Sequence, residues 1–237
     1  MRAARFYGKE DLRYEENVAE PQDILPGQVL VKPTFCGICG TDLHEYRDGS
    51  TWTPHPRNAY SGAELPQILG HEFAGEVVEV GAEVTSVKRG DRVSIQPQVG
   101  LRTDYFGRQN LFQLSKNSAV IGLSWPWGGM SDLALVNEYN AYRLPDDVSD
   151  ELGAMIEPAA VAVAAVDRSN LKPGDRVLVT GGGPIGVLTA MAARAARASR
   201  IVISEPNPAR RKRIEALDIV DEVLDPTEPD FVDRVRS

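Results

Sequence analysis

Short apolar runs separated by turn residues characterise the first part of this chain. Gln28-Val-Leu-Val-Lys32 and Gly75-Glu-Val-Val-Glu-Val80 are rich in β-branched residues and are bounded by glycine or proline, which predicts strands. Residues 47–66 and 96–128 show no periodicity and predict long loops. Loops of that length inside a compact domain are usually functional or disordered. The pattern therefore predicts a β-rich first domain, over residues 1–153.

The pattern changes to an alternation of strands and helices in the remaining residues, 154–237. We expect strands over 176–180, 200–204 and 221–224, and helices over 158–167, from the glycine turn at 181–186 to about 197, and over 207–217. Such alternation is typical of a parallel sheet with helices on its faces. The fold class predicted for the whole chain is α/β, with a smaller parallel-sheet domain after the β-rich one.

Composition adds limits on partners and location. The chain has 237 residues, 42% of them hydrophobic, and a formal net charge of −8. Acidic side chains surround the basic run at 210–213, which predicts a solvated helix face and no nucleic-acid partner. The start lacks the apolar core of a signal peptide, and no apolar run approaches the roughly 20 residues that span a bilayer. We expect a cytoplasmic protein without a membrane partner.

A glycine-rich turn provides the first candidate chemistry. The run Gly181-Gly-Gly183-Pro184-Ile185-Gly186 follows a predicted strand and opens a predicted helix. Glu205 lies 19 positions beyond Gly186 at the end of the next strand, the context of a dinucleotide fingerprint. There, Gly181 would allow the tight turn, Gly183 a close approach of the pyrophosphate, and Gly186 close packing of the helix. The alternative interpretation is a purely structural turn.

Glu205 also bears on the choice of dinucleotide. Its carboxylate would accept hydrogen bonds from the ribose hydroxyls and repel a 2′-phosphate, which favours NAD over NADP. Arg210 and Arg211 follow closely, and arginines there can bind a 2′-phosphate, so NADP stays the alternative.

The second candidate site is the run Cys36-Gly-Ile-Cys39-Gly-Thr41-Asp42-Leu-His44, followed by Gly70-His71-Glu72. The two cysteines could be half of a zinc ribbon or a redox pair. A ribbon needs two more cysteines or histidines at similar spacing, and the chain has none. A thioredoxin-type redox pair would sit at a strand-to-helix junction of its own domain, which the predicted surroundings do not resemble. The remaining option is an open catalytic metal site with three protein ligands and a water.

The order of these motifs resembles that of the zinc-dependent medium-chain alcohol dehydrogenases, most closely the branch of sorbitol and 2,3-butanediol dehydrogenases. The motifs are C-G-I-C-G-T-D-L-H, G-H-E, Glu157-Pro158 and G-G-G-P-I-G, and the resemblance covers essentially the whole chain. It implies a GroES-like zinc-binding catalytic domain over 1–153 and a partial Rossmann NAD-binding domain over 154–237. The implied reaction transfers hydride between a secondary alcohol, such as a diol or polyol, and NAD.

The resemblance also implies roles for single residues. The implied zinc ligands are Cys39, His71, Glu72 and Glu157, and Cys36 lies at a position that is not a ligand. Thr41 matches the hydroxyl that hydrogen-bonds the substrate oxygen, and His44 could pass the proton towards solvent. Asp42 is the candidate partner of the His71 imidazole. The cofactor positions are Gly181, Gly183, Pro184, Ile185, Gly186, Glu205 and Arg210.

Each of these assignments has a structural alternative. Glu157 precedes a proline at a helix start, where the helix dipole stabilises a carboxylate in any case. His44 could be a packed loop histidine, and His55 is expected to be a surface residue or a pocket wall. Trp52 and Tyr60 could line a substrate pocket or anchor the loop by packing.

Two features depart from the family. Many relatives hold a second, structural zinc with four closely spaced cysteines, and the corresponding stretch from about Gln96 to Gly122 has none, so we expect no structural zinc. A full cofactor domain has about six strands, whereas this chain predicts two or three. We therefore expect a C-terminally truncated chain, and a homo-oligomer if the missing part is supplied. The rival prediction is a non-catalytic zinc- or nucleotide-binding module with an open sheet edge that associates with other chains.

Overall fold

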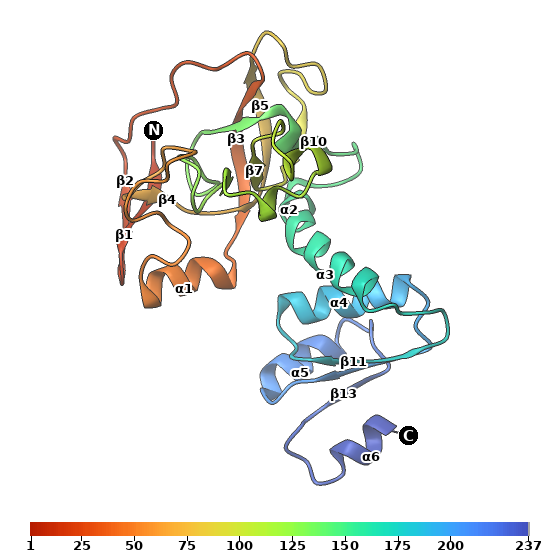
Figure 1. Ribbon diagram of the computed structural model, residues 1–237. Coiled ribbons are helices and arrows are strands. Elements are labelled where there is room, and N and C mark those ends of the chain that lie inside the picture. The colour runs from red at the N-terminus through yellow and green to blue at the C-terminus, as the bar shows by residue number, and fades with distance from the viewer. Residues whose placement is uncertain (237) are drawn as a thin grey trace. The chain divides into compact units, whose positions relative to one another are not determined.

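A computed structural model describes residues 1–236 (Figure 1). It divides into two compact units, Met1–Glu157 and Pro158–Ser237. The first unit is built mainly from antiparallel strands, and the second from parallel strands and helices. This agrees with the α/β fold class expected from the sequence. No helix among residues 1–236 is long and apolar enough to cross a lipid bilayer.

A five-stranded antiparallel sheet forms the centre of the first unit. Valines from its strands, including Val29, Val31 and Val77, are completely buried in the core. Alternation of such residues along a strand places them on one face of a sheet. In spatial order the strands are β10 (Ala141–Arg143), β6 (Arg92–Ile95), β5 (Glu72–Val80), β3 (Gln28–Gly37) and β9 (Ala134–Asn137).

Strands β3 and β5 are longer than the sequence pattern predicts. The predicted runs stop at Lys32 and begin at Gly75, whereas β3 continues to Gly37 and β5 already begins at Glu72. The pairing shifts register between Pro33 and Phe35, which marks a bulge. Proline and the bulge hide the strand from a search for simple alternation. The extension matters because it pairs Gly37 with Glu72 and so joins the two candidate metal motifs.

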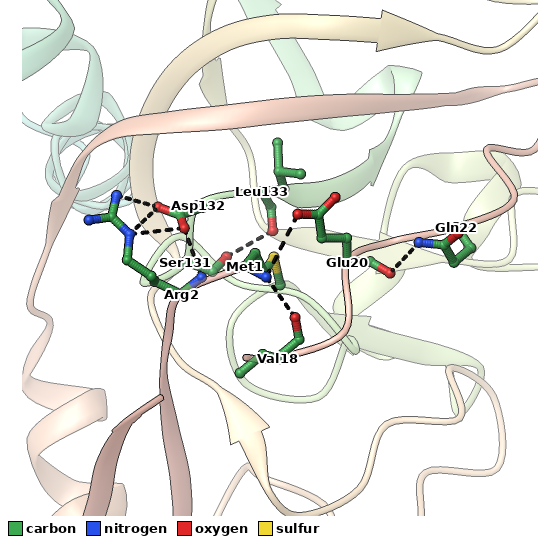
Figure 2. A network of polar contacts seen from close by, with 8 residues as sticks. All are labelled: Met1, Arg2, Val18, Glu20, Gln22, Ser131, Asp132 and Leu133. Carbon is green, nitrogen blue, oxygen red and sulfur yellow. Dashed lines mark hydrogen bonds and ion pairs between the residues drawn. The ribbon is translucent and has the colours of Figure 1, made fainter. Parts of the chain in front are cut away.

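The remaining strands of this unit form two smaller sheets. Polar contacts tie the N-terminal strand to the segment around Asp132 (Figure 2), where the Arg2 guanidinium forms an ion pair of 2.8 Å with the Asp132 carboxylate. The N-terminal amine of Met1 donates to the Val18 carbonyl at 2.8 Å. The small sheets contain β2 (Asp11–Glu15), β1 (Ala3–Gly8) and β4 (Gln67–Ile68) in one, and β7 (Gln98–Gly100) and β8 (Ser118–Val120) in the other.

Helix α1 (Gly40–Asp48) is an element that the sequence analysis missed. Its residues are mostly polar, so no apolar periodicity indicates a helix. The Asp42 carboxylate accepts a hydrogen bond from the backbone N–H of Cys39 at 2.9 Å, which caps the first turn. Gly49 ends the helix with φ of 97°. The sequence signal that could have predicted this helix is the acidic residue Asp42, three positions after the N-cap residue Cys39.

The segment predicted as a second long loop contains short ordered elements. The 3₁₀ helices Gly107–Gln109 and Phe112–Leu114 follow β7. The Asp104 carboxylate accepts hydrogen bonds from the Gly107 backbone N–H and the Ser115 hydroxyl, and these bonds lower the pKa of Asp104. One carboxylate thus links two points of the stretch between Gln96 and Gly122 that has no cysteine. A third 3₁₀ helix (Glu138–Asn140) and helix α2 (Asp150–Ala154) complete the unit.

The second unit is a three-stranded parallel sheet in the order β11, β12, β13. The strands predicted over 176–180 and 200–204 match β11 (Arg176–Thr180) and β12 (Arg200–Ser204) residue for residue. Ile201 and Ile203 of β12 are fully buried and pack with Ala190 and Ala193 of helix α4. The other elements are α4 (Pro184–Ala195), α5 (Pro208–Glu215), β13 (Glu222–Leu224) and α6 (Phe231–Arg236), and α3 (Ile156–Arg168) begins at the boundary between the units.

The close approach of Gly122 to Gly70 gives a stability test for the first unit. Gly122 and Gly90 both have positive φ, of 77° and 87°, but a Cβ on Gly122 would collide with the Gly70 carbonyl, whereas a Cβ on Gly90 would meet open space. We expect Gly90→Ala to cost about 1 kcal/mol of unfolding free energy from backbone strain. Gly122→Ala should cost roughly 3 kcal/mol or more, because overpacking adds to that strain.

Urea unfolding followed by tryptophan fluorescence measures the difference, because all three tryptophans, Trp52, Trp125 and Trp127, lie in the first unit. Equal losses in the two variants would contradict the packing of Gly122 against Gly70.

Candidate functional site

Strand pairing brings the two candidate metal motifs together. Gly37 at the end of β3 pairs with Glu72 at the start of β5, so Cys39 lies next to the His71-Glu72 pair. One ligand atom from each of Cys39, His71 and Glu72 lies within 4.8 Å of the others. Zinc binds sulfur at about 2.3 Å and imidazole nitrogen at about 2.0–2.1 Å, so two ligand atoms of one tetrahedral ion lie roughly 3.3–3.7 Å apart. The three side chains can therefore approach a single zinc ion with small side-chain adjustments.

Asp42 lies beside the imidazole of His71, as expected of its candidate partner. The Nδ1 atom of His71 lies 3.6 Å from Asp42 Oδ1, and both side chains are buried, with 7% and 4% exposure. This direction of Nδ1 leaves Nε2 for a metal, the arrangement in which a carboxylate supports a ligating histidine. His71 Nδ1 and Asp42 Oδ1 make no hydrogen bond within residues 1–236. A metal on Nε2 would fix Nδ1 as the protonated nitrogen and strengthen this contact.

The pKa of His71 depends on the same neighbouring groups. Burial by itself lowers this pKa, but the nearby acidic groups of Asp42 and Cys39 outweigh it and raise the pKa to about 10. A cation is therefore favoured at this position, and without a metal the proton supplies it. Metal binding must displace that proton, since only the neutral imidazole coordinates.

Glycine at position 37 makes room for the Glu72 carboxylate. A Cβ on Gly37 would collide with that carboxylate in its present position, so a side chain there would force Glu72 to move. Glu157, at the start of α3, is not among the three residues whose ligand atoms cluster. Burial raises the pKa of Glu157, the charge of His71 lowers it and the charge of Glu72 raises it. Glu157 thus lies within electrostatic reach of the site.

Helix α1 places the two candidate proton-transfer residues. The hydroxyl of Thr41 lies 3.7 Å from the Cys39 sulfur, at the first turn of the helix. His44 lies one turn later with its side chain 65% exposed, and its Nδ1 is 3.2 Å from the Asp48 carboxylate. The structure thus puts Thr41 beside the candidate metal ligands and His44 at the surface. An imidazole in that position can exchange protons with water.

The two cysteines occupy different environments. Cys36 lies on β3, opposite Phe73, and its sulfur packs at the edge of the core of the first unit. Burial, helped by the charges of Asp42 and Glu72, raises the pKa of the Cys36 thiol to about 12. Within residues 1–236, Cys36 is not among the three residues whose ligand atoms cluster, and its surroundings favour the protonated thiol.

The glycine turn of the second unit has the geometry of a phosphate-binding turn. Gly183 is the N-cap of α4 and Pro184 is its first residue, so the free N–H groups of Ile185 and Gly186 lie in the first turn. A Cβ on Gly183 would meet no atom within 4 Å, which leaves space for a ligand to approach. A Cβ on Gly186 would collide with the Gly181 carbonyl, so close packing requires this glycine.

Glu205 has a structural task in addition to the predicted one. Its carboxylate is only 3% exposed and accepts hydrogen bonds of 2.8 Å from the backbone N–H groups of Gly182 and Asn207. These bonds lower the pKa of Glu205. The Arg210 guanidinium lies 3.8 Å from the carboxylate and is largely exposed. The sequence analysis missed the contact with Gly182, because nothing in the local pattern links positions 23 residues apart.

The chain is similar to known dehydrogenases over nearly its whole length. The model of the alcohol dehydrogenase GroES-like domain matches residues 25–146. (R,R)-butanediol dehydrogenase of Bacillus subtilis is 41% identical over 98% of this chain. The crystal structure of 2R,3R-butanediol dehydrogenase from Bacillus subtilis superimposes with a TM-score of 0.88 at 39% identity, over 98% of this chain and 65% of that one.

A more distant solved structure carries a cofactor. A chain of Sinorhizobium meliloti described as a zinc-binding dehydrogenase was solved with NADP, and it has a TM-score of 0.85 at 31% identity over 98% of this chain and 64% of that one. This chain spans 65% of the length of the Bacillus subtilis butanediol dehydrogenase.

The two cysteines provide a matched pair of variants for the metal site. We expect the wild-type chain to bind about one zinc, Cys39→Ala to lose most of it, and Cys36→Ala to keep it, because only Cys39 lies in the ligand cluster. Zinc content after dialysis, measured by atomic emission, provides the comparison. Equal zinc loss in both variants would argue against the distinction between the cysteines.

Asp42→Asn tests the support of His71. The amide keeps the shape of the side chain but removes the negative charge, so zinc affinity should fall about 10–100-fold. Competition with a chromogenic chelator measures this affinity. Asp42 also caps α1, so the circular dichroism of the variant must match that of the wild type before the affinities are compared.

Proposed function

Because the chain belongs to the alcohol dehydrogenase family with a GroES-like domain, we propose that it serves as the zinc- and nucleotide-binding part of a dehydrogenase for secondary alcohols. The proposed substrates are small diols or polyols and the proposed electron acceptor is NAD. The observation that carries the proposal is the partly buried cluster of Cys39, His71 and Glu72, with Asp42 behind the imidazole. Its sulfur, nitrogen and oxygen ligand atoms suit zinc, and the lack of a side chain on Gly37 leaves space for the Glu72 carboxylate.

Bound zinc would polarise an alcohol oxygen and lower its pKa, which is the chemistry that such a site supplies. In this proposal Cys39, His71 and Glu72 hold the ion, and Glu157 is a further candidate ligand. Thr41 accepts a hydrogen bond from the substrate hydroxyl and orients that group. As the substrate proton moves to the Thr41 oxygen, Thr41 gives up its own hydroxyl proton towards His44, and the exposed imidazole releases a proton to water. Asp42 keeps the His71 ring in one orientation throughout.

The cofactor proposal rests on the second unit. The turn from Gly181 to Gly186, including Pro184 and Ile185, would bind the pyrophosphate with its free N–H groups. Glu205 would accept a hydrogen bond from a ribose hydroxyl, with the carboxylate lone pairs that the hydrogen bonds from Gly182 and Asn207 leave available. We propose NAD because this carboxylate is charged and repels a 2′-phosphate. Arg210 is the residue that would favour NADP, the cofactor in the Sinorhizobium meliloti structure.

The organisation of the protein belongs to the same proposal. We take the β-rich unit as the catalytic domain, with a boundary near residue 153, and the following unit as the dinucleotide-binding domain. The absence of cysteine between 96 and 122 supports one catalytic zinc without a structural one. A cytoplasmic location and a homo-oligomeric assembly complete the proposal.

One observation favours a second candidate function. Within residues 1–236, β11 pairs only with β12, and Leu178 on β11 is 41% exposed. An unpaired strand edge can associate with another chain. The alternative is therefore a zinc- or nucleotide-binding interaction module without turnover.

Incubation with NAD and a panel of diols separates the two functions. The dehydrogenase proposal predicts a rise in absorbance at 340 nm with the zinc-loaded chain, and at least a 100-fold lower rate with Cys39→Ala. Binding of zinc and NAD without any rise, together with association that depends on concentration, would favour the interaction module.

A further inference from the structure

Arg211 is a cation whose surroundings differ from those of its neighbour Arg210. Both lie on helix α5, shortly after Glu205. The backbone hydrogen bonds of Glu205 lower the pKa of its carboxyl group most, and the charges of Arg210 and Arg211 lower it further. The side chain of Arg210 is 59% exposed, whereas that of Arg211 is 20% exposed. Two positive charges therefore act on the carboxylate that is proposed to receive the ribose, but only one of them is open to solvent.

The Arg211 guanidinium is held by backbone carbonyls and by one carboxylate. Its Nη1 atom donates hydrogen bonds to the carbonyl of Glu205 at 2.7 Å and to the carbonyl of Pro206 at 2.8 Å. The same nitrogen lies 2.9 Å from Oδ2 of Asp225, whose side chain is only 17% exposed. Salt screens a partly buried ion pair less than an exposed one. Asp225 therefore offsets the charge of Arg211 inside the protein.

Asp225 is itself fixed at the end of the parallel sheet. It directly follows β13, and the carbonyl of Leu224 accepts a hydrogen bond from the backbone N–H of Glu205 at 2.9 Å, so the ends of β12 and β13 lie side by side. Oδ1 of Asp225 accepts hydrogen bonds from the backbone N–H of Thr227 at 3.0 Å and from its hydroxyl at 2.7 Å. With Thr227 on one oxygen and Arg211 on the other, the carboxylate keeps one orientation.

The four charged side chains at this end of the sheet cancel. Glu205 and Asp225 contribute two negative charges, and Arg210 and Arg211 contribute two positive charges. NADP differs from NAD by a phosphate on the adenosine ribose, and a phosphate monoester carries a charge of about −2 at neutral pH. Without Asp225 the group would have a net positive charge, which attracts such a phosphate. The uncharged 2′-hydroxyl of NAD would gain little from the same change.

We propose that Asp225 is a specificity-determining residue, which pairs with Arg211, withholds its positive charge from the 2′-phosphate of NADP and so keeps the second unit selective for NAD. This inference rests on the proposed binding of a dinucleotide and adds to it a residue outside the glycine turn and apart from Glu205. Because Asp225 acts through the charge of Arg211, its loss should strengthen the binding of NADP and leave that of NAD nearly unchanged.

The experiment compares the wild-type chain with Asp225→Asn and with Asp167→Asn, an exposed aspartate on α3 whose replacement makes the same chemical change. Asparagine keeps an oxygen for the hydrogen bonds from Thr227. Calorimetry with NAD and with NADP measures binding without any need for turnover, and displacement of NAD measures weak NADP binding. In Asp225→Asn we expect NADP to bind about fivefold more tightly at low salt and NAD to change less than twofold. Asp167→Asn should keep the wild-type ratio of the two affinities.

Salt distinguishes a charge effect from a change of shape. At about 0.5 M salt the Debye length falls to roughly 4 Å, so the gain in NADP affinity should shrink to less than about twofold. A gain of the same size at low and at high salt would contradict the role of charge.

Two further variants test the ion pair from its other side. Arg211→Gln leaves Asp225 without its cation, so NADP should bind about fivefold more weakly than to the wild type. Asp225→Asn combined with Arg211→Gln removes one charge of each sign and should restore the wild-type ratio. Because the two single variants shift the ratio in opposite directions, either one decides the proposal if the other does not fold. An unchanged ratio in whichever single variant folds would overturn it.

The outcomes separate this inference from the proposed function. Equal tightening of NAD and NADP in Asp225→Asn would overturn the specificity role while leaving the dinucleotide site in place. The expected shift in the ratio without turnover of any alcohol would support the inference and count against the proposed dehydrogenase function alone. A wild-type chain that binds neither dinucleotide would overturn both the nucleotide site and the role of Asp225.

Discussion

The antiparallel pairing of β3 with β5 is the constraint on which the candidate site depends. Its register sets Gly37 opposite Glu72 after a bulge near Pro33. Because side chains alternate between the two faces of a strand, a shift of one residue would turn Glu72 away from Cys39. The buried valines on both strands fix this register, since any slip would expose them. The hydrophobic core and the metal-ligand cluster are therefore products of the same pairing.

Carboxylates that accept hydrogen bonds from backbone N–H groups recur throughout the molecule. The buried Asp42 caps α1, the buried Glu45 holds the turn after it, and the partly exposed Asp104 links two points of the stretch between Gln96 and Gly122 that has no cysteine. Glu205 does the same in the second unit, where it joins the glycine turn to the end of β12. Each carboxylate holds loop backbone that would otherwise need strand pairing or a bound metal to fix it. The hydrogen bonds from the backbone offset the free-energy cost of removing the carboxylate from water. Irregular segments are thereby held firmly enough to carry functional side chains.

The sequence predicted regular elements well and irregular ones poorly. Strands β11 and β12 were predicted to the residue because each is a short apolar run between turn signals. Helix α1 was missed, since its stability comes from capping and from Glu45 and not from an apolar face. The length of β3 was missed because a proline and a bulge interrupt its alternation.

The sequence by itself determined the kinds of chemistry available: a thiol, an imidazole and carboxylates in spaced motifs, and a glycine turn between a strand and a helix. These are properties of neighbouring residues, and local spacing carries them. Only the tertiary structure decided that a ligand atom of Cys39 lies within 4.8 Å of ligand atoms of His71 and Glu72, and that Glu45 accepts the backbone N–H groups of the turn after α1. The physical reason is that residues 32 positions apart meet through strand register, and that burial, which sets the state of each thiol and carboxylate, is a property of the packed chain.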